Sequence, residues 1–149
     1  MTSTGVLLQL LARSTRLDFG AAQTVTLPVG IDDLAEDVLR HEPPTSGELE
    51  RAIDVVEDAL TGSRLARADR GDLVIADGLL RAVPGLAVPG TRLTREVIEA
   101  LFQRLASRSL GTPVSDEELP TGRDFAAGLL ILRECIHHLG FDGVQITAE

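Results

Sequence analysis

The chain has 149 residues and a formal net charge of −9, and 44% of its residues are hydrophobic. This length fits one domain with its own core, and no apolar run reaches the roughly 18 residues that a membrane span requires. The negative charge repels nucleic acid, polyphosphate and anionic membranes, so we expect none of them as a general partner. The only cysteine, Cys135, excludes an intramolecular disulfide and favours a reducing cytoplasm.

The N-terminal part of the chain predicts three short strands and then a helix. Residues 6–11 form an apolar run of strand length, and residues 15–19 and 23–29 alternate polar and apolar side chains. The connections between these strands are short, which favours an antiparallel meander. A helical face follows until Pro43 and Pro44 stop it, and its apolar positions are Ile31, Leu34, Ala35, Val38 and Leu39.

The second predicted helix has the clearest start, because Thr45 and Glu48 form a capping box. Its opposite, acidic face is most simply a solvated surface. Its apolar stripe at helical spacing consists of Leu49, Ala52, Ile53, Val56, Ala59 and Leu60. Residues 73–76 then predict a short buried strand, and residues 79–83 predict a helical turn.

Two further helices and a closing strand complete the predicted order. One helix starts at the cap candidate Thr94, and the other spans residues 124–139 and is stopped by Gly140. Residues 125–132 are apolar on every side, which predicts a helix covered on most sides. With a last strand at residues 144–147, residues 1–149 predict one α/β domain. Its order is β-β-β-α-α-β-α-α-β, with a mixed sheet covered by helices.

Three stretches of sequence carry a family resemblance. They are TLPVG at 26–30 with the segment 42–49, LTRE at 93–96, and RDFAAGLLIL at 123–132 with residues 139–146. In this order they resemble the second actin-like domain of the exopolyphosphatase and guanosine pentaphosphate phosphatase (Ppx/GppA) family. The resemblance covers most of the chain and implies a ribonuclease H-like fold, the fold of actin-like ATPase domains.

The resemblance also lets the phosphate-binding residues of the family be compared. In the family, the first hairpin carries an acidic residue that helps to hold Mg²⁺. It also carries three glycines before Ser-Thr, whose backbone N–H groups approach a phosphate. In this chain Gln9 replaces the acid, and Leu-Ala-Arg at 11–13 replaces the glycines. Only Ser14 and Thr15 match the family.

The second glycine-rich turn of the family corresponds here to Asp77 and Gly78, with one glycine and no hydroxyl residue. The family's Gly-x-Arg-x-Gly motif and its first actin-like domain have no counterpart in these 149 residues. The resemblance therefore implies a pseudoenzyme with no cofactor and no metal. A residual ligand contact is expected, if anywhere, at Ser14, Thr15, Asp77 and Gly78, because ligands usually bind at the carboxyl ends of strands in α/β sheets.

A metal site on the last helix is an alternative interpretation. Glu134 and His138 are four residues apart and share a helix face, but the neighbouring sequence offers no third ligand. The simpler interpretation places Cys135 in the core, with His137 and His138 near the helix C-terminus, where the dipole favours a cation. The apolar neighbours of Cys135 also argue against a reactive thiol.

Two charged clusters have structural interpretations as well. Acidic residues fill the first two turns of the first helix, where the helix dipole favours them; they are Asp32, Asp33, Glu36 and Asp37. An arginine-rich loop is expected to be solvated, although it could instead bind an anion or a partner. Its arginines are Arg64, Arg67 and Arg70.

The preferred functional hypothesis is a non-catalytic cytoplasmic protein that acts by association, as a homodimer. In the family, one face of this domain packs against the first domain. A domain that occurs alone must either cover this face or carry polar residues there. The alternative is a small phosphate- or nucleotide-binding protein or phosphohydrolase, with a site near Ser14 and Asp77. A third hypothesis is that a separate polypeptide supplies the missing half of the cleft.

Overall fold

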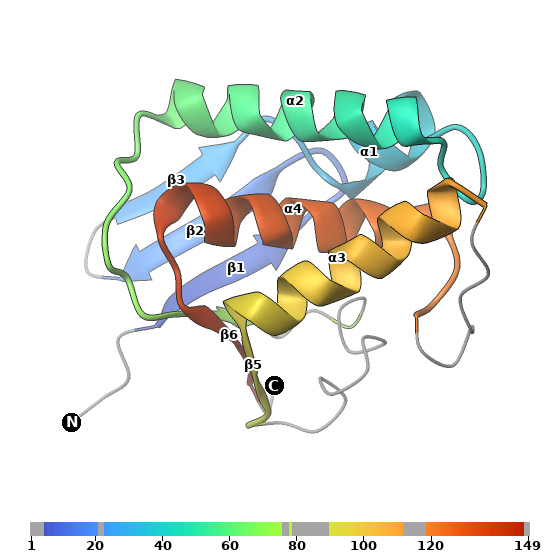
Figure 1. Ribbon diagram of the computed structural model, residues 1–149. Coiled ribbons are helices and arrows are strands. Elements are labelled where there is room, and N and C mark those ends of the chain that lie inside the picture. The colour runs from blue at the N-terminus through green and yellow to red at the C-terminus, as the bar shows by residue number, and fades with distance from the viewer. Residues whose placement is uncertain (1–4, 21–22, 76–77, 79–89, 112–118, 148–149) are drawn as a thin grey trace.

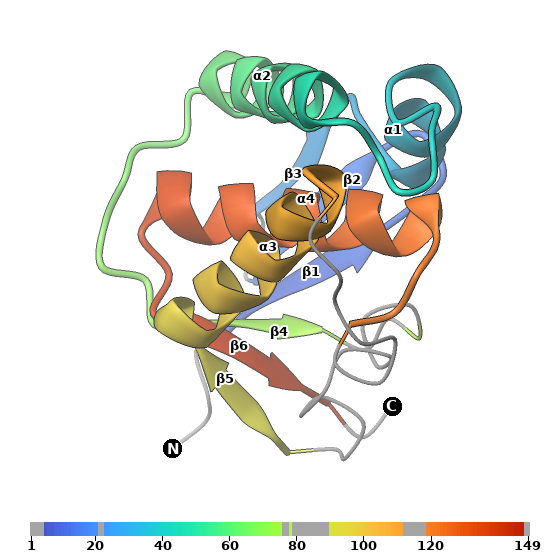
Figure 2. The same ribbon diagram turned by 45° about the vertical axis from the view of Figure 1, so that its right-hand side comes forward.

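The computed structural model describes residues 5–20, 23–75, 78, 90–111 and 119–147, which form six strands and four helices (Figure 1). The helices lie together on one face of a single sheet, as two views of the molecule show (Figures 1 and 2). The predicted α/β class with a mixed sheet is therefore confirmed.

The sheet has the strand order β3-β2-β1-β4-β6-β5. Its first strands are β1 (Val6–Leu10), β2 (Thr15–Gly20) and β3 (Gln23–Leu27), which form the predicted antiparallel meander. The remaining strands are β4 (Asp72–Ile75), β5 (Arg92–Thr94) and β6 (Gly143–Ile146). β4 runs parallel to both β1 and β6, so the C-terminal ends of these three strands lie at the same end of the sheet.

β5 is an element that the sequence analysis does not predict. It has three residues and pairs antiparallel with β6 at the edge of the sheet. The observed order is therefore β-β-β-α-α-β-β-α-α-β, one strand more than predicted. The helical turn predicted at residues 79–83 lies outside the described residues.

The helices are α1 (Ile31–Asp37), α2 (Ser46–Ser63), α3 (Arg95–Ser109) and α4 (Arg123–Leu139). α4 lies in the middle of the helical layer, with α1 and α2 on one side and α3 on the other (Figures 1 and 2). All of residues 125–132 are buried, which confirms that this helix is covered on most sides. Among the described residues, no helix has both the length and the apolar character needed to span a membrane.

The two faces of the sheet differ in character because side chains alternate along each strand. The face toward the helices is apolar and buried, with Leu8, Leu17, Leu73 and Val144 among its residues. We call the opposite side the outer face, and within the described part of the chain no helix covers it. Its exposed or half-buried residues include Leu7, Gln9, Arg16, Asp18, Thr24, Thr26, Asp72, Val74, Arg92, Thr94 and Gln145.

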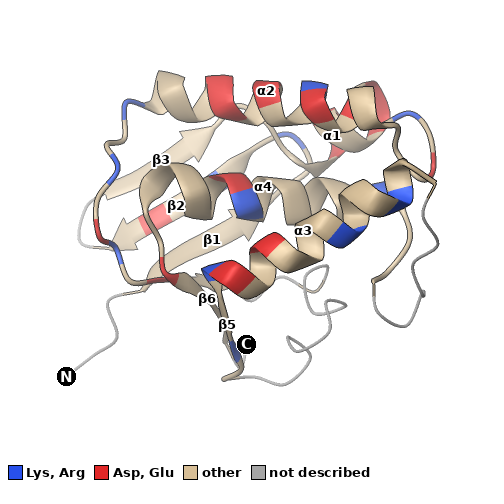
Figure 3. Ribbon diagram, in the orientation of Figure 1, with Lys and Arg blue, Asp and Glu red and all other residues tan. Residues whose placement is uncertain are grey.

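The start of α2 confirms the predicted capping box. Thr45 Oγ1 accepts a hydrogen bond from the Glu48 backbone N–H at 3.1 Å, and Glu48 Oε1 accepts one from the Thr45 backbone N–H at 3.0 Å. Acidic residues follow the length of this helix (Figure 3). Most of them are exposed as predicted, but Glu57 is half-buried against α4.

The arginine-rich loop after α2 is more than a solvated loop, which corrects the prediction. Arg67 Nη1 donates to the His137 carbonyl oxygen at 2.9 Å, and Arg70 Nε donates to the Leu139 carbonyl oxygen at 2.8 Å. These arginines therefore cap the C-terminus of α4, where the last carbonyl groups of a helix lack partners within it. The chain turns there at Gly140 with φ of 86°, and an added Cβ would meet the Ala68 carbonyl oxygen.

Candidate functional site

The positions predicted for a ligand contact follow β1 and β4 in the sequence. Because β1 and β4 are parallel neighbours, the loop at 11–14 and the segment after Ile75 leave the same end of the sheet. Asp77 lies outside the described residues. Gly78 is described and exposed, with no neighbouring atom near the position of an added Cβ.

The loop at 11–14 packs directly against the start of α1. The Ile31 N–H donates to the Leu11 carbonyl oxygen at 3.0 Å, and the Asp32 N–H donates to the Ala12 carbonyl oxygen at 2.8 Å. A Cβ at Gly30 would lie 2.4 Å from the Leu11 carbonyl oxygen, so this close approach requires glycine. The first N–H groups of α1, which in many proteins bind anions, are thus bonded to the loop.

Arg13 links the same loop to the acidic face of α1. Its guanidinium lies 2.8 Å from Asp33 Oδ1, 3.0 Å from Glu36 Oε1 and 3.7 Å from Asp37 Oδ2. Asp33 also accepts a hydrogen bond from the Gly30 N–H at 2.9 Å. Asp33, Glu36 and Asp37 therefore pair with Arg13, a contact that the sequence analysis does not predict.

The hydroxyl of Thr15 points into the protein. Thr15 is fully buried, and its Oγ1 donates to the Val29 carbonyl oxygen at 2.8 Å. Ser14 is half-buried beside it, and its carbonyl oxygen accepts the Leu11 N–H at 2.9 Å. Ligand binding at Ser14, Thr15, Asp77 and Gly78 stays a prediction, to which the structure adds that Thr15 Oγ1 already has a partner.

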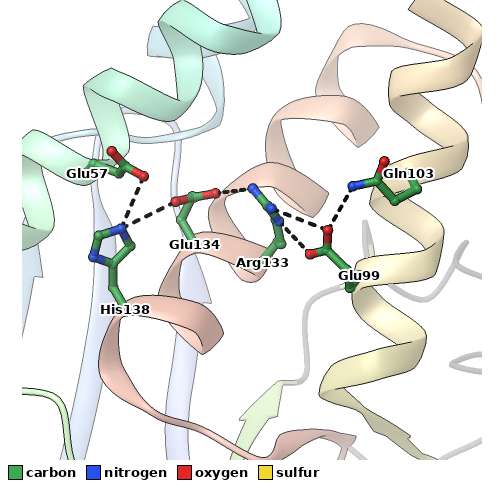
Figure 4. Close-up of polar contacts among 6 residues, drawn as sticks. All are labelled: Glu57, Glu99, Gln103, Arg133, Glu134 and His138. Carbon is green, nitrogen blue, oxygen red and sulfur yellow. Dashed lines mark hydrogen bonds and ion pairs between the residues drawn. The ribbon is translucent and has the colours of Figure 1, made fainter.

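A chain of polar side chains crosses α4 between α2 and α3 (Figure 4). At its centre Arg133 Nη1 donates to Glu134 Oε2 at 2.6 Å. The same guanidinium donates to both carboxylate oxygens of Glu99 on α3, at 2.8 and 3.3 Å, and Gln103 donates to Glu99 at 2.8 Å. The guanidinium also lies 4.4 Å from the centre of the Phe102 ring. Arg133 is therefore fixed by several contacts on its α3 side.

The other end of this chain brings together Glu57, Glu134 and His138 (Figure 4). His138 Nε2 lies 3.2 Å from Glu57 Oε2 on α2 and 3.6 Å from Glu134 Oε1. Burial raises the pKa of Glu134, and the neighbouring charge of Arg133 opposes this effect. Sequence reasoning pairs Glu134 with His138 but misses Glu57, which α2 brings close by packing against α4. Imidazole nitrogen and carboxylate oxygens are donors that can hold a metal ion.

Cys135 and His137 contribute no donor atom to this group, although the His137 ring lies edge-on to that of His138, with 5.7 Å between the ring centres. Cys135 is fully buried, and burial raises the pKa of its thiol to about 12, so it is an inert core residue as predicted. Burial lowers the pKa of His137, which favours its neutral imidazole. At His137 burial thus opposes the helix dipole, which favours a cation at this end of α4.

Comparisons with known proteins bear on the fold. No family model matches the chain, and no curated protein matches its sequence. A solved Ppx/GppA enzyme from Aquifex aeolicus superimposes with a TM-score of 0.72 at 19% identity, over 99% of this chain and 54% of that chain. The fold is that of a Ppx/GppA domain.

Other solved structures agree with this assignment. The type II variant of the Aquifex aeolicus Ppx/GppA phosphatase gives a TM-score of 0.72 at 20% identity, over 95% of this chain and 52% of that chain. An exopolyphosphatase-like protein gives 0.72 at 16% identity, over 97% of this chain and 56% of that chain. The chain thus spans about half the length of the structures it matches. The predicted resemblance and the actin-like fold are confirmed, and at this identity the likeness concerns the fold alone.

Proposed function

We propose that this Ppx/GppA-like domain is non-catalytic and acts by association with a second copy of itself through the outer face of its sheet. The observation that carries the proposal is the apolar centre of that face, which no helix of the described residues covers. Leu7 on β1 and Val74 on β4 are direct neighbours in the sheet register, and both are partly exposed.

The surroundings of this apolar centre are polar. On the neighbouring strands, Asp18 of β2 lies opposite Leu7, and Gln145 of β6 lies opposite Val74. A central apolar area with a polar rim is the usual composition of a protein–protein interface. Leu7 and Val74 would lie in the middle of such an interface.

The rim carries both signs of charge. Arg92 forms two hydrogen bonds to Asp72, at 2.7 and 2.9 Å, and these bonds lower the pKa of the Asp72 carboxyl. On β2, Arg16 and Asp18 extend from the same face. A two-fold axis brings the same patch of both copies together, so Arg16 of each copy can pair with Asp18 of the other.

The loop at 11–14 supports the non-catalytic part of the proposal. A phosphate-binding loop presents backbone N–H groups to its ligand. Here the carbonyl groups of Leu11 and Ala12 bond to the first N–H groups of α1, and the Arg13 side chain is bound by α1 carboxylates.

Light scattering of the purified chain at tens of micromolar tests the association. We expect a dimer that Leu7→Glu and Val74→Glu convert to a monomer, while circular dichroism verifies that both variants are folded. Leu110→Glu is the matched control, because Leu110 is 74% exposed on the helical side. A strict monomer of the wild-type chain contradicts the proposal.

A phosphate-release assay with Mg²⁺ and either polyphosphate or guanosine pentaphosphate tests the absence of hydrolysis. We expect no release above the blank. A thermal-shift series with the same compounds tests the alternative of a residual phosphate site at the edge where Ser14 lies. Stabilisation by a phosphorylated ligand that Asp77→Ala abolishes would establish that alternative instead.

A further inference from the structure

We propose that Glu57, Glu134 and His138 bind one zinc ion between α2 and α4. The proposal concerns a different part of the molecule from the outer face and is independent of the association. It rests on the donor types, the distances between donor atoms and the unpartnered state of a buried carboxylate oxygen.

The donor atoms match the needs of zinc in kind and in spacing. Zinc takes imidazole nitrogen and carboxylate oxygen at about 2.0–2.2 Å, which in a tetrahedral site places the donors roughly 3.3–3.6 Å from one another. His138 Nε2 lies 3.2 Å from Glu57 Oε2 and 3.6 Å from Glu134 Oε1. All three donor atoms lie within 4.8 Å of one another. Two of these separations are therefore already close to those of a zinc site.

The buried oxygen of Glu134 gives the independent indication of a ligand. Glu134 is 1% exposed, and its Oε1 has no hydrogen-bond partner. His138 Nε2 makes no hydrogen bond of good geometry either, and its nearest oxygen is Glu57 Oε2 at 3.2 Å. A buried carboxylate oxygen without a partner is costly. The 3.6 Å separation from His138 Nε2 is too long for a hydrogen bond between them. A cation at this point would satisfy both atoms at once.

The other oxygen of Glu134 is held in place. Arg133 Nη1 bonds Glu134 Oε2 at 2.6 Å, and Glu99 and the Phe102 ring hold Arg133 in turn (Figure 4). Partners of this kind orient the ligands of metal sites and raise their affinity. Glu134 Oε1 is thereby directed toward His138 before any ion arrives.

The site lies close to the surface, and its charge suits a divalent cation. The side chain of His138 is 33% exposed and that of Glu57 is 40% exposed, while His138 Nε2 and Glu134 Oε1 are themselves buried. An ion enters by rotation of the two exposed side chains and keeps a water as fourth ligand. Two carboxylates balance the charge of Zn²⁺. Mg²⁺ prefers six oxygen ligands and suits this mixed donor set poorly.

A protonated His138 between the two carboxylates is the competing explanation of the same geometry. It predicts no specific uptake of zinc. Calorimetric titration of the full chain with zinc therefore separates the two explanations. We expect one ion per chain and at least about ten-fold weaker binding in Glu57→Gln and in His138→Gln.

Matched variants control for nonspecific binding. His137→Gln and Asp58→Asn change the neighbouring residues on the same helices and are expected to leave the affinity unchanged. His41→Gln removes a second histidine–glutamate pair, in which Nδ1 lies 2.7 Å from Glu48 Oε2 at the surface. We expect no effect of this change either. Because Glu134 is buried and its replacement could prevent folding, Glu57 and His138 carry the test.

Thermal denaturation gives a second readout. Zinc is expected to raise the melting temperature of the wild-type chain and not that of His138→Gln, since an ion that binds the folded state stabilises it. Three results would each overturn the proposal. They are no zinc binding at micromolar concentrations, affinity that Glu57→Gln and His138→Gln leave unchanged, and Mg²⁺ binding as tight as that of zinc.

Discussion

At the scale of single residues, Thr15 shows how a residue predicted to contact a ligand is used inside this fold. Its hydroxyl is buried and donates to the carbonyl oxygen of Val29, which is itself buried. Thr15→Val keeps the shape of the side chain but leaves this carbonyl oxygen without its partner. We expect a loss of about 1–3 kcal/mol in the free energy of unfolding, the usual effect of an unpaired buried polar group. Denaturant unfolding measures it.

Thr26→Val is the matched control for that substitution. Thr26 lies opposite Arg16 in the sheet register and is exposed, so the same change removes no buried hydrogen bond. We expect it to change the stability by less than about 0.5 kcal/mol. Equal effects of the two substitutions would show that the Thr15 hydroxyl makes no stabilising contribution.

At the scale of elements, the N-terminus of α2 makes stability depend on pH. Burial tends to raise the pKa of Glu48, but hydrogen bonds from His41 and from backbone N–H groups, including that of Thr45, outweigh it and lower the pKa to about 2. The folded-state pKa is below that of the unfolded chain. The contribution of Glu48 is therefore complete above pH of about 4.5 and is lost as the pH falls toward about 2.

Glu48→Gln tests this contribution. We expect it to lower the free energy of unfolding at pH 7 by about 1 kcal/mol, because solvent screening reduces the effect at a helix end. We also expect a flatter dependence of stability on pH below about 5. Glu50→Gln, at an exposed position two residues later, is expected to change neither quantity. Identical acid-unfolding curves for Glu48→Gln and the wild type would contradict the prediction.

Sequence reasoning predicts the elements whose signals are local. The capping box of α2 and the stop of α4 at Gly140 each depend on residues within one turn of a helix, and both are confirmed. β5 has no such signal, because its three residues become a strand only by pairing with β6, which comes much later in the chain. The capping role of Arg67 and Arg70 is not predicted for the same reason, since the carbonyl groups that they cap belong to α4.

The candidate metal site combines two residues that a local sequence pattern pairs with a third that no local pattern predicts. The spacing of Glu134 and His138 predicts a shared helix face, and the structure confirms that their side chains meet. Glu57 reaches them only through the packing of α2 against α4, which no short motif encodes. In the loop at 11–14, the sequence predicts that side chains replace glycines. It does not predict that the N–H groups of α1 bond to the loop.

At the scale of the whole molecule, the net charge of −9 opposes the proposed self-association. Two copies repel each other at long range, and salt weakens this repulsion. The Debye length falls from about 20 Å at 0.02 M salt to about 6 Å at 0.3 M. We therefore expect the dissociation constant of the dimer to fall several-fold over this range, as measured by sedimentation equilibrium.

A double variant separates this general repulsion from contacts within the interface. Asp54→Asn with Asp58→Asn removes two negative charges from exposed positions of α2, a helix that lies on the side of the sheet opposite the outer face (Figure 1). Because the repulsion depends on total charge, the variant should dimerise more tightly than the wild type at low salt and equally at high salt. If salt instead weakens the dimer, ion pairs such as that of Arg16 with Asp18 dominate the interface. The variant would then dimerise no more tightly than the wild type at low salt. This result would contradict the proposal that the apolar contacts of Leu7 and Val74 are the main stabilising contribution to the interface.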